Sequence, residues 1–244
     1  MRDSRSITDD RRPNDRFERS ALVIARPGHE LGVHGWLEIA RPLTFVISRG
    51  DRHQRLRLAS TASVLNRAGA CPGSVFGRLD DQDIYTALLH SDESLFAEVR
   101  DELATSLIER DVRTVLVAVN GKMDACATLS RTLAVDAARL ASEGTGHAVQ
   151  TLEATSEALP RARDSRDTAG RIELRLDDSA LARKLRATRA YPLLVDVEQT
   201  LRTYGPEALR VEELTEVAGV LGVPKVSNVR GNVHRWGRSF YRIS

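Results

Sequence analysis

Short apolar runs without polar alternation are the feature that most limits the fold of this chain. A strand formed by such a run must be buried on both faces. Three such runs occupy residues 21–25, 43–47 and 112–119, and a polar loop and then a helical pattern follow each of them. Uninterrupted apolar runs are typical of strands in a parallel sheet. Strand, loop and helix in regular succession predict crossover connections. We therefore predict an α/β fold with a mostly parallel sheet sandwiched by helices and a helical C-terminal extension.

The chain divides into four parts. Residues 1–20 offer almost nothing to bury and are expected to be a disordered tail. Residues 21–154 are the predicted sheet-and-helix core, and 155–170 read as a polar loop or linker. Residues 171–244 form a C-terminal extension of strand and helices.

The predicted helices of the core and a further strand follow from apolar periodicity. The helices are expected over residues 30–40, 55–70, 81–90, 95–110 and 124–142, and the strand over 147–152.

The extension begins with its own strand and helix signals. Apolar and charged residues alternate over 171–176, which predicts a strand with one wet face. A cap at 177–179 precedes a long helical pattern that Pro192 could kink. Residues 207–218 predict another short helix.

Composition and charge exclude several classes of protein. The 36 basic residues nearly balance the 34 acidic ones, so net charge does not imply a nucleic-acid partner. All but three of the basic residues are arginines, which reflects either compositional bias or polyanion binding. No apolar run approaches the ~20 residues that span a bilayer, and the N-terminal segment lacks the apolar stretch of a signal peptide. We expect a cytoplasmic protein without membrane contact.

Ligands of parallel α/β sheets bind beyond the carboxyl ends of the strands. That rule points to the loops 26–30, 48–53 and 120–125. In the first loop, polar groups at a helix N-terminus suit a metal or an anion. His29 is a candidate metal ligand there, and Glu30 could orient it.

The first loop and its flanks also carry a family resemblance. Ala25-Arg26-Pro27-Gly28-His29-Glu30-Leu31-Gly32 resembles the opening motif of the PIG-L/LmbE superfamily of N-deacetylases, in which Ala-His-Pro-Asp-Asp-Glu follows an apolar strand and precedes a helix beginning Leu-Gly. The resemblance covers residues 21–145 and extends weakly through 187–214. It implies a Rossmann-like α/β sandwich and zinc-dependent removal of an acyl group. The implied substrate is a small molecule, an N-acyl amino sugar or another N-acylated biosynthetic intermediate.

Several positions depart from that motif, and the resemblance therefore implies a degenerate zinc site. Arg26 stands where the first zinc-binding histidine belongs, and a guanidinium has no lone pair to offer a metal. Gly28 replaces the aspartate base, and His29 replaces a ligand aspartate but could still bind zinc. Met123, just before Asp124, stands where the third ligand is expected, and methionine is a poor zinc ligand.

The resemblance also implies roles for an active enzyme. His29 would bind the metal, Asp124 would act as a ligand or as acid and base, and Glu30 would support the ligand shell. An anionic group of the substrate, such as phosphate or carboxylate, would pair with cationic side chains. Those substrate-binding candidates are Arg26, Arg49 and Lys122. Further side chains that could complete a rearranged metal site are His34, Asp51 and His53, although His34 could instead simply pair with Glu30.

Residues 225–244 interleave basic and aromatic side chains without any acid. Single-stranded nucleic-acid binding uses such a composition, and so does a segment that docks on its own domain or on a protein partner. No nucleic-acid motif accompanies the segment, which favours docking.

Two main function hypotheses follow. The first is a divergent PIG-L-like hydrolase of the N-deacetylase type. The second is a catalytically inactive relative that serves as a binding or scaffold subunit in a biosynthetic pathway, and the residues at positions 26 and 123 motivate it. A third hypothesis is association with nucleic acid or a partner through 225–244.

Overall fold

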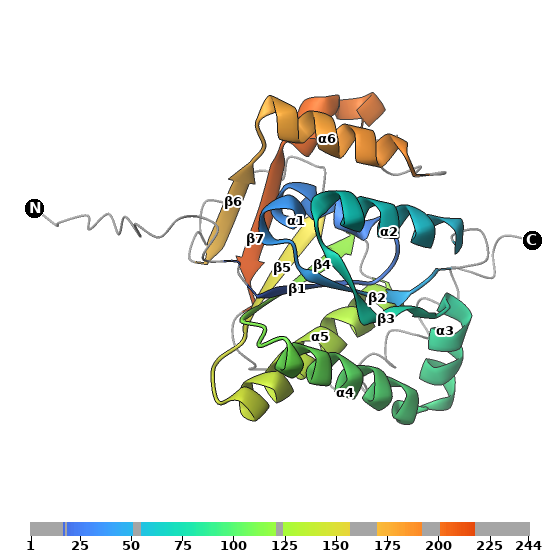
Figure 1. Ribbon diagram of the computed structural model, residues 1–244. Coiled ribbons are helices and arrows are strands. Elements are labelled where there is room, and N and C mark those ends of the chain that lie inside the picture. The colour runs from blue at the N-terminus through green and yellow to red at the C-terminus, as the bar shows by residue number, and fades with distance from the viewer. Residues whose placement is uncertain are drawn as a thin grey trace, which may run out of the picture.

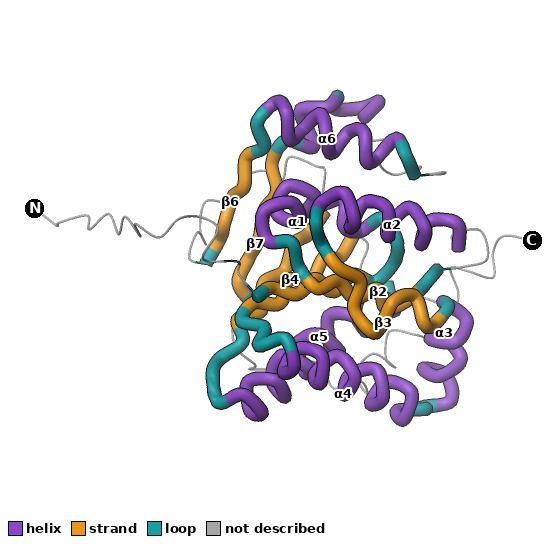
Figure 2. Tube along the Cα trace, in the orientation of Figure 1, coloured by secondary structure: helices purple, strands orange, loops and turns teal. Residues whose placement is uncertain are grey.

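The computed structural model describes residues 17, 19–50, 55–120, 124–156, 170–191 and 201–217. In this part of the chain, helices cover both faces of one seven-stranded sheet (Figures 1 and 2). None of the helices described is long and apolar enough to cross a membrane. The segments 225–244 and most of 1–20 lie outside the described residues, and so does most of the predicted linker 155–170.

The elements alternate between strands and helices through the core. In chain order they are β1 Ser20–Ile24, the 3-10 helix η2 His29–Val33, α1 His34–Ala40, β2 Leu43–Ser48, α2 Arg55–Ala68, β3 Cys71–Leu79, α3 Asp81–His90, α4 Glu93–Glu109, β4 Thr114–Asn120, α5 Ala125–Thr145, β5 Gln150–Ser156, β6 Arg171–Arg175, α6 Asp178–Arg189, the 3-10 helix η3 Pro206–Leu209 and β7 Val211–Glu216.

The strands lie in the order β3-β2-β1-β4-β5-β7-β6. The first five pair in parallel, whereas β7 pairs antiparallel with both β5 and β6. The predicted α/β fold with a mostly parallel sheet is therefore confirmed. The three apolar runs of the sequence form β1, β2 and β4, which lie inside the sheet because every face of them must be covered.

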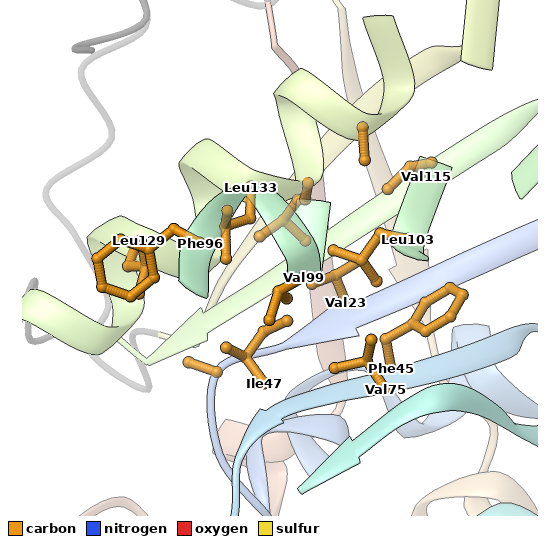
Figure 3. Close-up of a cluster of buried hydrophobic side chains, with 14 of the residues drawn as sticks. Val23, Phe45, Ile47, Val75, Phe96, Val99, Leu103, Val115, Leu129 and Leu133 are labelled. Carbon is orange, nitrogen blue, oxygen red and sulfur yellow. The ribbon is translucent and has the colours of Figure 1, made fainter. Parts of the chain in front are cut away.

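Two apolar cores sandwich the sheet. In Figure 1, α4 and α5 lie below it and α1, α2 and α6 above it. Figure 3 shows the lower core, in which Val23 and Phe45 of the sheet face Val99 and Leu103 of α4. Leu22, next to Val23 in β1, belongs to the upper core, as the alternating directions of strand side chains require.

The edge strand β3 was not predicted from the sequence. No strand was predicted over the segment that forms β3, because Pro72, Gly73 and Gly77 interrupt its pattern. β3 lies at the edge of the sheet, where a proline without an N–H is tolerated. Its pairing with β2 shifts register twice along its length.

The helix predicted over 207–218 is wrong beyond its first residues. Only the single turn η3 is helical, and β7 follows it. Glu212 and Leu214 are the buried positions of β7. Because a charged residue occupies one inward position, the hydrophobic alternation of a strand is hidden in the sequence.

The carboxylate of Glu212 ties the extension to the core. Its Oε1 lies 2.8 Å from Lys184 Nζ of α6, in an ion pair that is almost completely buried. The same carboxylate accepts hydrogen bonds from the N–H groups of Gly35 and Trp36, at 2.8 and 2.9 Å, in the first turn of α1. Leu176 packs so closely there that a Cβ added at Gly35 would lie 2.1 Å from its Cδ2.

Candidate functional site

The chain leaves β1 through a tight turn that leads directly into η2. Gly28 adopts a left-handed conformation, with φ of 100°, which favours glycine. Within the turn, the N–H of His29 donates to the Arg26 carbonyl at 3.3 Å. Glu30 Oε2 accepts a hydrogen bond from the N–H of Gly28 at 2.8 Å, so the glutamate fixes the turn that precedes it.

Beyond this turn, the guanidinium of Arg26 lies between two carboxylates. Its Nε is 3.1 and 3.0 Å from the two carboxylate oxygens of Asp81, and its Nη1 donates to Oδ2 of Asp124. The Arg26 side chain is only 15% exposed. Burial alone lowers the pKa of the guanidinium, but Cys126, Asp81 and Asp124 raise it above its ordinary value. Arg26 is therefore permanently charged.

Both carboxylates are held by their own local structure. Asp81 is the first residue of α3, and its Oδ1 accepts from the Ser48 hydroxyl at 2.7 Å. Asp124 is the N-cap of α5, and its Oδ1 accepts from the N–H of Ala127 at 2.8 Å. The carboxyl ends of β1, β2, β3 and β4 thus contribute to one cluster, as the rule for parallel sheets predicts.

His29 lies beside this cluster. Its Nδ1 is buried and has no hydrogen-bond partner. Burial and the charge of Arg26 lower the pKa of the imidazole to about 4, against the opposing effects of Asp124 and the backbone of Ala118. The ring is therefore neutral near pH 7, the state that both a metal ligand and a general base require.

Glu30 is fully buried on the other side of the turn. Burial raises the pKa of its carboxyl to about 7, although its own N–H, that of Gly28 and the Thr61 hydroxyl act to lower it. Its Oε1 has no hydrogen-bond partner, and no cation among the described residues pairs with it. These contacts belong to a group that shapes the turn, and its catalytic role stays a prediction.

The remaining candidates are more scattered. Arg49 pairs with Asp80, with 3.3 Å between Nη2 and Oδ2, next to the cluster. His34 lies elsewhere, near Glu38 and Glu212. Candidates outside the described residues are Asp51, His53, Lys122 and Met123.

Asp81 and Ser48 were missed by the sequence analysis. Asp81 follows β3. Because no strand was predicted there, the rule that ligands bind beyond the carboxyl ends of strands did not point to this residue. The acidic pair Asp80 and Asp81 before a predicted helix was the available signal. Ser48 was visible as the start of a predicted loop, but nothing in the sequence set it apart from other serines.

The described residues do not fit a catalytic zinc ion. A catalytic zinc needs three protein ligands and an open position. Among the residues with described positions, no three histidine, cysteine or acidic side chains converge on a common point. Asp81 and Asp124 instead direct oxygens at the Arg26 guanidinium.

Comparison with known proteins yields matches at the level of structure only. No family model and no curated protein matches the sequence. A triple mutant of a deacetylase of the teicoplanin biosynthetic pathway matches with a TM-score of 0.54 and 15% identity, over 82% of this chain and 98% of its own. The A40926 pseudoaglycone deacetylase Dbv21 matches with a TM-score of 0.53 and 17% identity, over 82% and 97%.

A third match is the zinc-inhibited form of teicoplanin deacetylase Orf2, with a TM-score of 0.54 and 14% identity, over 82% of this chain and 98% of its own. At such identities the likeness concerns the course of the backbone and not the residues of the site. It agrees with the fold that the motif at residues 25–32 implied. The chain therefore has the α/β fold of the glycopeptide-antibiotic deacetylases.

Proposed function

We propose that this chain is a divergent PIG-L-like protein that binds an N-acylated amino sugar or a related biosynthetic intermediate and does not hydrolyse it through zinc. The arrangement of Arg26 between Asp81 and Asp124 is the observation that supports this proposal. The fold shared with deacetylases and the motif at residues 25–32 support the ligand class.

The charge of Arg26 is the physical obstacle to zinc. A guanidinium has only donors and stays protonated, so it cannot replace the missing histidine. A zinc ion bound by Asp81 and Asp124 would have to displace the guanidinium from two ion pairs and then sit beside its charge. The guanidinium of Arg26 already neutralises part of the negative charge of Asp81 and Asp124.

The same groups can bind a polar molecule. Asp81 and Asp124 are 20% and 28% exposed, so their outer faces can accept hydrogen bonds from hydroxyl or amide donors. Arg49 and Lys122 remain the proposed partners of an anionic group on the ligand.

An active hydrolase is the second candidate, and the state of His29 favours it. The neutral imidazole of His29 is the form that takes a proton from water and passes it to the departing amine, and its buried Nδ1 would have to become accessible for this reaction. Asp124 would stabilise the resulting imidazolium, and Arg26 would stabilise negative charge on the attacked carbonyl. This reaction would use no metal.

The test is to measure bound metal and ligand binding together. Protein purified without chelator is expected to contain far less than one zinc per chain by mass spectrometry and to bind N-acetylglucosamine derivatives by calorimetry. The double variant Arg26→His with Met123→His is expected to gain zinc, and Arg49→His is the matched control. Stoichiometric zinc that His29→Ala removes would overturn the proposal, and so would turnover of the acylated ligand without metal, which would favour the second candidate.

A further inference from the structure

The cluster of Arg26, Asp81 and Asp124 carries more negative than positive charge. Two carboxylates face one guanidinium, so one negative charge stays uncompensated within these three side chains. Both carboxylates are also more exposed to solvent than the guanidinium between them. A partly exposed group of one charge attracts ligand groups of the opposite charge, so this cluster favours a cation.

The neighbouring described side chains do not reverse this balance. His29 is neutral near pH 7, because burial and the charge of Arg26 lower its pKa to about 4. Arg49 and Asp80 form an ion pair with each other and so contribute no net charge. The charge that a ligand meets at the Arg26 cluster is therefore negative.

The hydrogen bonds already made within the cluster lead to the same conclusion. A carboxylate only accepts hydrogen bonds, through about four lone pairs on its two oxygens. Asp124 accepts one bond from the N–H of Ala127 and one from Arg26, on different oxygens, so each oxygen keeps a lone pair for a ligand. Asp81 accepts from Ser48 and Arg26 at Oδ1, but only from Arg26 at Oδ2. The carboxylates thus offer acceptors, and a ligand must bring the donors.

A primary amine meets these requirements better than an acylated amine does. A protonated amine carries one positive charge and three N–H donors. The amide nitrogen of an N-acyl group is neutral and has a single donor. Hydrogen bonds between groups of opposite charge are about twice as strong as those between neutral groups. The cluster should therefore distinguish the two forms of the same sugar.

We propose that the Arg26 cluster binds the free amine of a deacylated amino sugar, whose ammonium group donates to the carboxylates of Asp81 and Asp124. Hydrolysis of an N-acyl amide by water releases such an amine together with a carboxylic acid. The chain would then act after a deacylation step, as the protein that binds its amine product. The proposal rests on the proposed function, because it narrows the ligand class of the same site.

Calorimetry on the full chain tests the proposal with glucosamine, N-acetylglucosamine and glucose, which differ only in the group on one carbon atom. At about pH 6 an aliphatic amine is protonated. Glucosamine is expected to bind about tenfold more tightly than the other two sugars. Added sodium chloride should reduce this difference, because salt screens partly exposed charges.

The outcomes separate this proposal from the proposed function. Equal affinities of glucosamine and N-acetylglucosamine, or tighter binding of the acylated sugar, would overturn the proposal and leave the proposed function standing. Absence of binding for all three sugars would overturn both.

Two aspartates with the same local role give a matched pair of variants. Asp124 and Asp177 are the N-caps of α5 and α6, and each accepts a bond from a helix N–H, at 2.8 and 2.7 Å. Asparagine caps a helix as well as aspartate does, so Asp124→Asn removes the charge and keeps the cap. This variant is expected to weaken glucosamine binding about tenfold and to change N-acetylglucosamine binding less, whereas Asp177→Asn should change neither.

Asp81→Asn is a second test of the same charge, because it also removes one carboxylate and keeps an oxygen that can accept from Ser48. Melting temperatures of all variants show which of them are folded. Wild-type affinity for glucosamine in folded Asp124→Asn and Asp81→Asn would overturn the proposal, and so would an equal loss in Asp177→Asn.

Discussion

Replacement of Glu30 by glutamine gives the sharpest test of the buried turn. The carboxyl has a pKa of about 7 in the folded protein and an ordinary value of 4.5. The folded state therefore holds a proton that the unfolded state has already released between these two values. Because the unfolded state binds fewer protons there, the wild type loses stability as the pH rises from about 4.5 to about 7, and loses no more above that range.

The size of the effect follows from the difference between the two values. About 2.5 pH units at about 1.4 kcal/mol each correspond to roughly 3 kcal/mol. Glutamine does not ionise, so the Glu30→Gln variant is expected to lack this loss. Its free energy of unfolding, minus that of the wild type, should increase by about 3 kcal/mol between pH 4.5 and pH 8.

The assay is urea unfolding followed by circular dichroism at half-unit steps across that range. Glu98→Gln serves as the control, because the Glu98 side chain is 64% exposed and is expected to follow the wild-type curve. A Glu30→Gln curve that runs parallel to the wild-type curve from pH 4.5 to pH 8 would refute the reasoning.

Three further predictions concern the same structure. Because burial lowers the pKa of His29 to about 4, the wild type loses stability as the pH falls from about 6.5 to about 4. The His29→Gln variant should lack up to about 3 kcal/mol of that loss. A free energy of unfolding in urea that falls equally in both proteins over this pH range would contradict the prediction. Lys184→Met leaves the buried Glu212 without its cation and should lower the free energy of unfolding by about 3–5 kcal/mol. The double variant Lys184→Met with Glu212→Gln should lower it by less. Equal melting temperatures of the two variants would contradict the pairing. Chelator treatment should leave the melting temperature unchanged, and a drop that zinc reverses would show a metal-stabilised fold.

The sequence predicted the strands that are buried on both faces. β1, β2 and β4 are covered on both faces, so their apolar runs carry the whole signal. β7 gave no such signal, because Glu212 fills an inward position and is tolerated only through Lys184, a partner 28 residues away in the chain. An ion pair between distant segments has no local pattern in the sequence.

In the candidate site, only the residues that follow predicted strands could be predicted. Arg26 and Asp124 follow predicted strands, so the rule for carboxyl ends brought them together in advance. Asp81 follows an edge strand whose proline and glycines hid it, and it was missed for that reason. Thr61 and Tyr191 resembled ordinary core positions of helices, and only the folded arrangement joins their hydroxyls in a buried hydrogen bond.

The antiparallel place of β7 in the sheet has a consequence for synthesis on the ribosome. β5 is complete at residue 156, but the strand that covers its outer edge ends only at residue 216. Until then, the nascent chain presents an open row of backbone groups, to which other chains could add. The same delay leaves the first turn of α1 without the carboxylate that receives its N–H groups. A chain stopped before β7 should therefore aggregate, because β7, the last of the described strands to emerge, is the one that covers the open edge of β5.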